Sequence, residues 1–286
     1  MTESIDRNCL SYWFPKLEAA GLPVPKTEIV RWPGEPWGLA DVCDGKEPAG
    51  WLPFVETVRQ AALRISPTGP WFLRTGQGSG KHNWDHCCNV TDLNRLGSHI
   101  GSLVMWSHEV DMLGLAHEVW VVRERLPVKP VAILPVYNNM PLVTEVRVFV
   151  RGGKVICAHD YWPTGAIADG LGMPRNRKGE VTDPALGMRL LDLVEGAKFT
   201  PEDFRMWGPL ACKVALLFAD DGAWSVDLLK TDRGWHVTDM AEAHRSFHWE
   251  GCPRAAGFGP APRAEEPGRP HAEGSGLVRV ADEGAV

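Results

Sequence analysis

Two aspartates near the C-terminal end of the chain have the residue type and spacing of a metal site. Asp227 and Asp239 each lie in an apolar segment that predicts a β-strand, where aspartate is disfavoured. A turn centred near Arg233 would pair the two strands and bring the carboxylates almost opposite each other. Like charges in such a position are destabilising unless a cation lies between them, and carboxylate oxygens suit Mg2+. We therefore predict a magnesium site at Asp227 and Asp239.

A second pair of charged residues, Glu145 and Arg147, lies in the apolar sequence LVTEVRVFV. Because side chains alternate along a strand, both residues project from the same face. Burying an acid and a base there is costly without partners. Two explanations stay open, a cross-strand salt bridge or a contact between Arg147 and a phosphate group, and we favour the second.

The segment WFLRTGQGSGKHNW, residues 71–84, combines three alternating glycines with cations at both ends. Glycine lets the backbone approach a ligand closely, and the cations suit a polyphosphate. The segment has neither the Walker A pattern nor the dinucleotide-binding G-x-G-x-x-G pattern. It predicts a strand, a glycine-rich loop and a second strand at 86–90. A mobile lid over a ligand and an ordinary surface hairpin explain it equally well.

Hydrophobic periodicity predicts the elements that must position these residues. Helices are expected at 11–20, 52–65, 91–110 and 184–196, with another beginning at Thr200. Strands are expected near 22–32 and at 118–126, 142–151, 154–159, 212–219, 223–231 and 234–240. After Trp249 the chain is rich in glycine, proline, alanine and glutamate, so residues 251–286 are predicted to be disordered.

Composition limits the class of protein. The 286 residues are 44% hydrophobic with a formal net charge of -6, which argues against a surface that binds nucleic acid generally. No segment predicts a membrane span or a signal peptide, so we expect a cytoplasmic location and no membrane partner.

The cysteines and histidines give no recognisable metal signature in the sequence. Seven scattered cysteines without a C-x-x-C pair predict buried, reduced thiols and neither a disulfide framework nor a zinc knuckle. His244 and His248 lack the glutamate that a zinc peptidase would need after the first histidine. A zinc site at His82, His86 and Cys87 is conceivable, but their spacing is not diagnostic.

The order of five segments resembles the ATP-grasp superfamily, especially the branch with phage and bacterial ATP-grasp domain proteins and eukaryotic translation-factor assembly chaperones. These segments are YWFPKLEAAGLPVPKT, FLRTGQGSGKHNW, VWVVRERLPV, TEVRVFVRGGKVICAHDYW and SVDLLK with WHVTDMAEAHRSFHW, which together span most of residues 10–249. The resemblance implies an α+β fold of two lobes, each an antiparallel sheet flanked by helices, with ATP in a cleft between them.

Domain boundaries follow from the same resemblance. It implies an N-terminal segment at 1–66 that packs on the core and a lid lobe with the glycine-rich loop at 67–127. A C-terminal lobe with the metal site is expected at 128–250, before the disordered tail at 251–286.

The resemblance also assigns roles to residues. Arg74 corresponds to the cationic lid-strand residue, and the loop at 76–83 to the one that covers the phosphates. Arg147 and Lys81 would be catalytic, and Asp227 and Asp239 would hold Mg2+. The ATP-binding residues would be Arg74, Gly76, Gly78, Ser79, Gly80, Lys81, the hinge residues Val122, Arg123, Glu124, Arg125 and Leu126, and Glu145 and Arg147.

One departure from the family pattern concerns the closing motif. The family often has asparagine two residues after the last acid, where this chain has Ala241. Either a ligand is missing or another residue replaces it, for which Glu242, His244 and Ser246 are candidates.

The implied reaction is that of a Mg-ATP-dependent ligase, which activates a carboxylate as an acyl phosphate for attack by an amine or similar nucleophile. The partners would be small-molecule or peptide carboxylates and amines. An ATP-binding assembly factor without ligase chemistry and a phosphotransferase remain alternatives. Candidates for contacting the acceptor are His159, Asp160, Tyr161, Trp162, Arg175 and Arg177.

Overall fold

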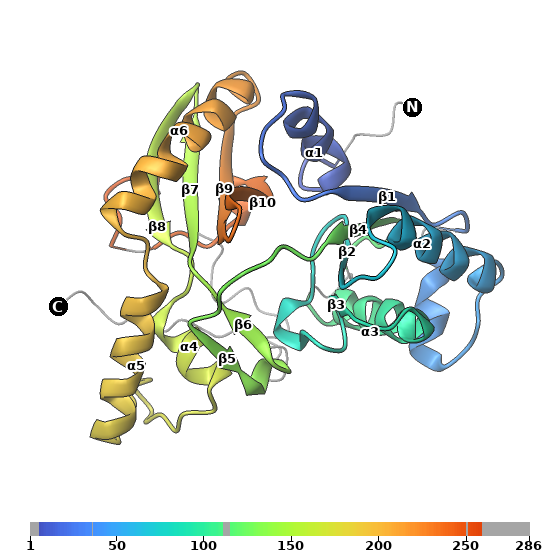
Figure 1. Ribbon diagram of the computed structural model, residues 1–286, viewed down its shortest axis with the longest axis horizontal. Helices are drawn as coiled ribbons and strands as arrows, with labels where there is room; N and C mark the ends of the chain where they lie inside the picture. The colour runs from blue at the N-terminus through green and yellow to red at the C-terminus, as the bar shows by residue number, and fades with distance from the viewer. Residues whose placement is uncertain (1–5, 36, 111–114, 250, 259–286) are drawn as a thin grey trace.

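A computed structural model describes residues 6–35, 37–110, 115–249 and 251–258 of the chain. Two four-stranded antiparallel sheets form the centres of two lobes, which lie side by side (Figure 1). The α+β class with two antiparallel-sheet lobes is therefore confirmed.

The first lobe has the strand order β1-β4-β2-β3. Its strands are β1 (Thr27–Arg31), β2 (Trp71–Thr75), β3 (Asn89–Val90) and β4 (Val119–Glu124). Its helices are α2 (Trp51–Ile65) and α3 (Leu96–Glu109), with 3-10 turns at Gly38–Asp44, Lys81–Asn83 and Leu93–Arg95. Phe54, Leu73, Leu103 and Trp120 share one buried apolar core, so the two helices cover the sheet on the side away from the second lobe.

The second lobe has the strand order β10-β9-β7-β8. These strands are β7 (Glu145–Arg151), β8 (Lys154–Asp160), β9 (Ala223–Thr231) and β10 (Gly234–Glu242). Below the sheet in Figure 1 lie a small hairpin and two helices, namely β5 (Ala132–Leu134), β6 (Met140–Leu142), α4 (Thr164–Gly170) and α5 (Pro184–Ala197). A further 3-10 turn, Pro135–Tyr137, joins β5 to β6.

The predicted strand at 212–219 is wrong, because these residues continue helix α6 (Pro201–Leu217). Trp207, Ala211, Val214 and Phe218 recur at helical spacing and are buried in the core of the second lobe. The eight residues that suggested a strand are the end of this longer helical pattern. The helix start at Thr200 is as the sequence predicts, and the residue that forms a reciprocal pair of hydrogen bonds with Thr200 is Asp203.

The elements within the first 66 residues belong to both lobes, whereas the prediction treated these residues as one segment that packs on the core. Helix α1 (Leu10–Ala19) buries Trp13, Phe14 and Leu17 in the core of the second lobe. In contrast, β1 pairs with β4 of the first lobe and α2 packs on that sheet. The chain therefore passes between the lobes twice, before β1 and after β4. The two passages meet where the backbone N–H of Glu124 donates to the carbonyl of Lys26, at 3.0 Å.

Part of the segment predicted to be disordered has a defined structure. Residues 251–258 are described, with a 3-10 turn at Ala255–Phe258, and Phe258 is buried against Phe149. The rest of the predicted disordered segment, 259–286, lies outside the described residues. In the part of the chain that is described, no helix is both long and apolar enough to cross a membrane.

Candidate functional site

A cavity of about 400 Å³ lies between the two sheets, within the range of small-molecule sites. Its walls combine apolar side chains with charged ones from both lobes. The apolar part includes Phe72, Leu126, Val128, Met140 and Pro141, and the charged part includes Arg74, Lys81, Arg123, Arg125, Glu124, Glu145, Asp227 and Asp239. A ligand that carries both an apolar ring and a charged group would match this lining.

Four polar residues form one row across the second sheet. Asp239 is paired with Asp227, Asp227 with Arg147, and Arg147 with His159 on the adjacent strands. Directly paired residues project from the same face, so this row runs from the cavity to the β8 edge. Arg147 holds both oxygens of Asp227, with Nε to Oδ1 at 2.8 Å and Nη2 to Oδ2 at 2.9 Å.

The position of Asp239 depends on an irregularity of the hairpin. The β9–β10 register shifts by one residue between Val237 and Asp239, and without this shift Thr238 would oppose Asp227. The bulge brings the two carboxylates opposite each other, as predicted, although the sequence did not reveal the bulge. It also turns the carbonyl of Thr238 toward Nη1 of Arg123, at 2.5 Å.

The first sheet contributes two buried arginines to the cavity wall. Arg74 on β2 and Arg123 on β4 are each 3% exposed. Arg74 reaches across the cavity to Oδ1 of Asp239, at 3.1 Å. Arg123 lies over the rings of Trp13 and Phe14, and its Nε and Nη2 have no hydrogen-bond partner among the described residues. Burial, and then the charge of Arg74, lower the pKa of Arg123 to about 9.

Lys81 and Glu145 form a further contact between the lobes. Nζ of Lys81 lies 3.3 Å from Oε2 of Glu145 and 3.9 Å from the centre of the Tyr161 ring. Burial lowers the pKa of Lys81, but Glu145 and Tyr161 outweigh it and the pKa is raised. Burial raises the pKa of Glu145, while Lys81 opposes this rise. Each charge therefore stabilises the other at the edge of the cavity.

Arg147 lies behind the cavity wall in this structure. It does not line the cavity; its guanidinium holds Asp227 and lies 4.7 Å from the centre of the Tyr161 ring. Of the two explanations left open by the sequence, the contacts match the cross-strand salt bridge. Its partner is Asp227 on β9, however, and the predicted contact with a phosphate stays a prediction.

The three glycines of the loop are explained by close packing. A Cβ added at Gly76 would lie 2.4 Å from Sγ of Cys9, and one at Gly78 would lie 2.3 Å from the Trp106 ring. Gly80 has φ +58, a conformation that favours glycine. None of the three lines the cavity, whereas Ser79 and Lys81 do. The loop therefore presents Ser79 and Lys81 to the cavity and uses its glycines to pack closely against the neighbouring side chains.

The segment predicted as a hinge follows the wall of the cavity. Arg123, Glu124, Arg125 and Leu126 line it, whereas Val122 faces the core of the first lobe. Glu124 accepts from the backbone N–H of Lys26 and from Nη2 of Arg233, each at 2.9 Å. Burial raises the pKa of the Glu124 carboxyl, but these donors outweigh it, so the pKa is lowered.

The remaining candidates divide into those at the cavity and those away from it. Glu242, His244 and Ser246, which were considered as substitutes for the missing asparagine, do not line the cavity. Instead Glu242 pairs with Arg7 and Asn8. Of the acceptor candidates, Tyr161 and Trp162 line the cavity, whereas His159, Asp160, Arg175 and Arg177 do not. The other carboxylates that line the cavity beside Asp227 and Asp239 are Asp85, Glu124 and Glu145.

Three comparisons with known proteins were made. No model of a protein family matches the chain, and no curated protein sequence matches it. Solved structures do match, and they include Cdc123 from Schizosaccharomyces pombe, with 11% identity over 82% of each chain and a TM-score of 0.47. They also include a biotin carboxylase complex from Campylobacter jejuni, with 13% identity and a TM-score of 0.43 over 82% of this chain and 40% of the other.

A third matched structure is an ATP-grasp ligase, PsnB, complexed with a precursor peptide and AMPPNP. Its identity is 14% and its TM-score 0.35, over 82% of this chain and 49% of the ligase. The chain thus spans about half or less of the two enzymes' lengths. These structures agree with the ATP-grasp resemblance in fold.

Proposed function

We propose that the chain binds Mg-ATP in the cavity between its lobes and uses it as a ligase that joins a carboxylate to an amine. The observation that carries the proposal is the opposition of two kinds of charge across one cavity. Arg74 and Arg123 lie on one wall, and Glu145, Asp227 and Asp239 lie on the other. In a nucleotide with a divalent cation, the negative phosphates would complement the arginines and the cation would complement the carboxylates.

The donor set fits the cation. Asp227 and Asp239 provide carboxylate oxygens on adjacent, rigid strands, which is the chemistry that Mg2+ prefers. Both would hold the ion, and Arg147 would keep Asp227 in place. When bound, Mg2+ supplies charge neutralisation at the transferred phosphate.

Phosphate groups would replace contacts that now join the lobes. Arg74 and Lys81 each have a single carboxylate partner across the cavity, at Asp239 and Glu145. Arg123 offers two donors that have no partner among the described residues. An anion between the arginines would offset the cost of burying them side by side.

The apolar residues of the cavity suit a nucleotide base. Phe72, Leu126 and Met140 would pack against the ring. The backbone N–H groups of Glu124 and Arg125 already donate to Lys26 and Pro70, so hydrogen bonds to the base would come from the N–H of Leu126 and from carbonyls of this segment.

In the proposed reaction a carboxylate oxygen of the acceptor attacks the γ-phosphorus and ADP leaves. The amine then attacks the acyl carbon, the C–O bond to phosphate breaks, and inorganic phosphate leaves with an amide formed. Lys81, held over the rings of Tyr161 and Trp162, would stabilise the negative charge on the transferred group.

One observation favours a second candidate, an ATP-binding assembly factor. Exposed large apolar side chains concentrate on two successive helices away from the cavity, which is a feature of surfaces that bind partners. They are Met188 and Leu191 on α5, and Phe204, Met206, Leu216 and Leu217 on α6. A factor of this kind would bind ATP without forming an amide.

Thermal unfolding with and without Mg-ATP tests the binding site. Occupancy at about 100 times the dissociation constant should add ~2.7 kcal/mol to the stability of the wild type. Asp239→Asn should lose this response, while Asp192→Asn, a change at an exposed acid on α5, should keep it. Equal responses from both variants would remove Asp239 from the site, and no response from the wild type would refute ATP binding.

The reaction needs a separate measurement. Incubation with Mg-ATP and panels of carboxylates and amines should release ADP and phosphate together with an amide visible by mass spectrometry. Nucleotide binding without ADP release would favour the assembly factor. ADP release with a stable phosphorylated product would indicate a phosphotransferase.

A further inference from the structure

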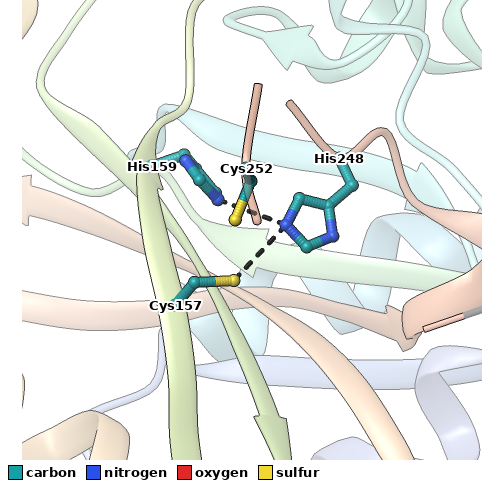
Figure 2. A group of neighbouring side chains, drawn as sticks. All are labelled: Cys157, His159, His248 and Cys252. Carbon is teal, nitrogen blue, oxygen red and sulfur yellow. Dashed lines mark hydrogen bonds between the residues drawn. The ribbon is translucent and has the colours of Figure 1, made fainter. Parts of the chain in front are cut away.

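Two cysteines and two histidines converge at the β8 edge of the second sheet. Cys157 and His159 lie two residues apart on β8, so both project from the same face. His248 and Cys252 come from the segment after β10, about ninety residues further along the chain. Figure 2 shows the four side chains pointing toward one another. None of them lines the cavity between the lobes.

The distances are close to those of a tetrahedral metal site. One potential ligand atom from each residue lies within 4.8 Å of the other three. Nε2 of His248 is 3.3 Å from Nε2 of His159 and 3.3 Å from Sγ of Cys157. Zinc–nitrogen bonds of about 2.0–2.1 Å and zinc–sulfur bonds of about 2.3 Å give tetrahedron edges of roughly 3.3–3.8 Å. A single ion would therefore reach all four atoms with small adjustments.

The donor types select the metal. Two thiolates and two imidazoles are a donor set of structural zinc sites, whereas magnesium prefers oxygen and iron–sulfur clusters are usually held by four cysteines. The spacing His-x3-Cys between His248 and Cys252 also falls within the range found in such sites. We propose that Cys157, His159, His248 and Cys252 bind one structural zinc ion.

The surroundings agree with a closed site. Burial lowers the pKa of both histidines, that of His159 to about 4, so each ring is neutral and has a lone pair for a metal. Burial and the neighbouring Cys252 raise the pKa of Cys157 to about 12, and a bound cation would reverse this by favouring the thiolate. With four protein ligands there would be no open coordination position, which indicates a structural and not a catalytic role.

The ion would fix the last described segment to the sheet. His248 stacks on Phe149 with ring centres 4.0 Å apart, and Phe258 lies 5.1 Å from the same ring. This small apolar cluster contains three buried residues, Phe149, Ala243 and Phe258. A metal link from β8 to residues 248–252 would supply much of the stability that so small a cluster lacks.

Metal content of the purified protein is the first test, and it is independent of ATP binding. Wild-type protein prepared without chelators should contain one zinc per chain. Cys252→Ser should lose it, whereas Cys212→Ser, which changes an exposed cysteine on α6, should retain it. Equal zinc in the two variants, or none in the wild type after zinc is supplied, would overturn the proposal.

Cobalt titration of metal-free, reduced wild type avoids any dependence on the folding of a variant. The ligand-field and thiolate charge-transfer absorption of tetrahedral cobalt should develop to one equivalent, and zinc should displace it. Removal of the metal should lower the thermal midpoint, and zinc, but not magnesium, should restore it. Absence of the cobalt bands would contradict the site. So would an intact mass and thiol count showing a Cys157–Cys252 disulfide in freshly isolated protein.

Discussion

The two sheets that face the cavity differ in how their charges are balanced. On the second sheet each carboxylate has a cation, since Arg147 holds Asp227, Lys81 holds Glu145 and Arg74 reaches Asp239. On the first sheet Arg123 donates to a single neutral carbonyl and has two nitrogens without a partner among the described residues. Only Asp227 is paired within its own sheet, because Lys81 and Arg74 reach their carboxylates from the first lobe. Arg123 of the first sheet, in contrast, forms no ion pair among the described residues.

Because of this difference, variants of the two sheets should affect protein stability and ligand binding differently. Removing one member of a balanced pair on the second sheet should leave an unpaired buried charge and destabilise the protein. Removing Arg123 should instead eliminate an unpaired buried charge, so it should weaken the binding of an anion without destabilising the protein. Variants of Asp227 and Arg123 test this contrast directly, and variants of Gly78 and His117 measure how the first lobe depends on packing and on pH.

The largest effect is expected for Asp227→Ala. Arg147 would lose both of its hydrogen bonds to the carboxylate and remain a largely buried cation, at a cost of about 3–5 kcal/mol in the free energy of unfolding. The double variant with Asp227→Leu and Arg147→Met should recover most of the loss. Urea unfolding of both, with Asp192→Ala as the exposed control, measures this. A single variant as stable as the control would show that the pair contributes nothing.

A smaller loss is expected for Gly78→Ala in the loop of the first lobe. The added methyl group would lie 2.3 Å from the Trp106 ring, and overpacking of this kind costs roughly 1–3 kcal/mol. Gly187→Ala on α5 meets nothing within 4 Å and should be neutral or slightly stabilising. If Gly78→Ala kept full stability but lost the Mg-ATP response, the glycine would serve the ligand and not packing.

Arg123→Met should change stability least among the cavity variants. The apolar side chain keeps contact with Trp13 and Phe14 and removes a buried charge, so the free energy of unfolding should stay the same or rise by about 1 kcal/mol. The thermal shift caused by Mg-ATP should nevertheless decrease. A large loss of stability would mean that the hydrogen bond to Thr238 matters more than the charge.

The smallest effect concerns pH and a histidine of the first lobe outside the cavity. Burial lowers the pKa of His117 below its usual value of 6.5, so the unfolded chain takes up a proton first as the pH falls. The contribution of His117 to stability is therefore present above pH 6.5 and decreases below it. His117→Gln should flatten the dependence of the unfolding free energy on pH between about 7 and 5. An unchanged slope would assign this dependence to other groups.

Local sequence patterns predicted most helices and strands. The prediction failed where only the last part of a longer helical pattern was considered. The apolar residues at 212–219 fit a strand when taken alone, but with Trp207 and Leu210 they continue a helical repeat. The Gly152–Gly153 turn and the pairing of β7 with β8 follow directly from residue types.

The types of several residues that line the cavity were predictable from the sequence, but the partners of these residues were not. Asp227 and Asp239 stand out because they interrupt apolar strands. That Arg147 pairs with Asp227 depends on β7 lying beside β9, an order that local sequence does not encode. The Cys and His cluster was missed for the same reason, since its two halves are about ninety residues apart in the chain and the His-x3-Cys spacing of the second half is not diagnostic without the first.

The double passage of the chain between the lobes restricts how they can move. The segments before β1 and after β4 are hydrogen-bonded to each other at Lys26 and Glu124, through backbone and side chain. Two lobes joined by one connecting segment can rotate about it in any direction. Two adjacent connecting segments permit hinge bending and resist twisting of one lobe against the other. Opening and closing of the cavity for a ligand would therefore follow one hinge-bending motion of the two lobes.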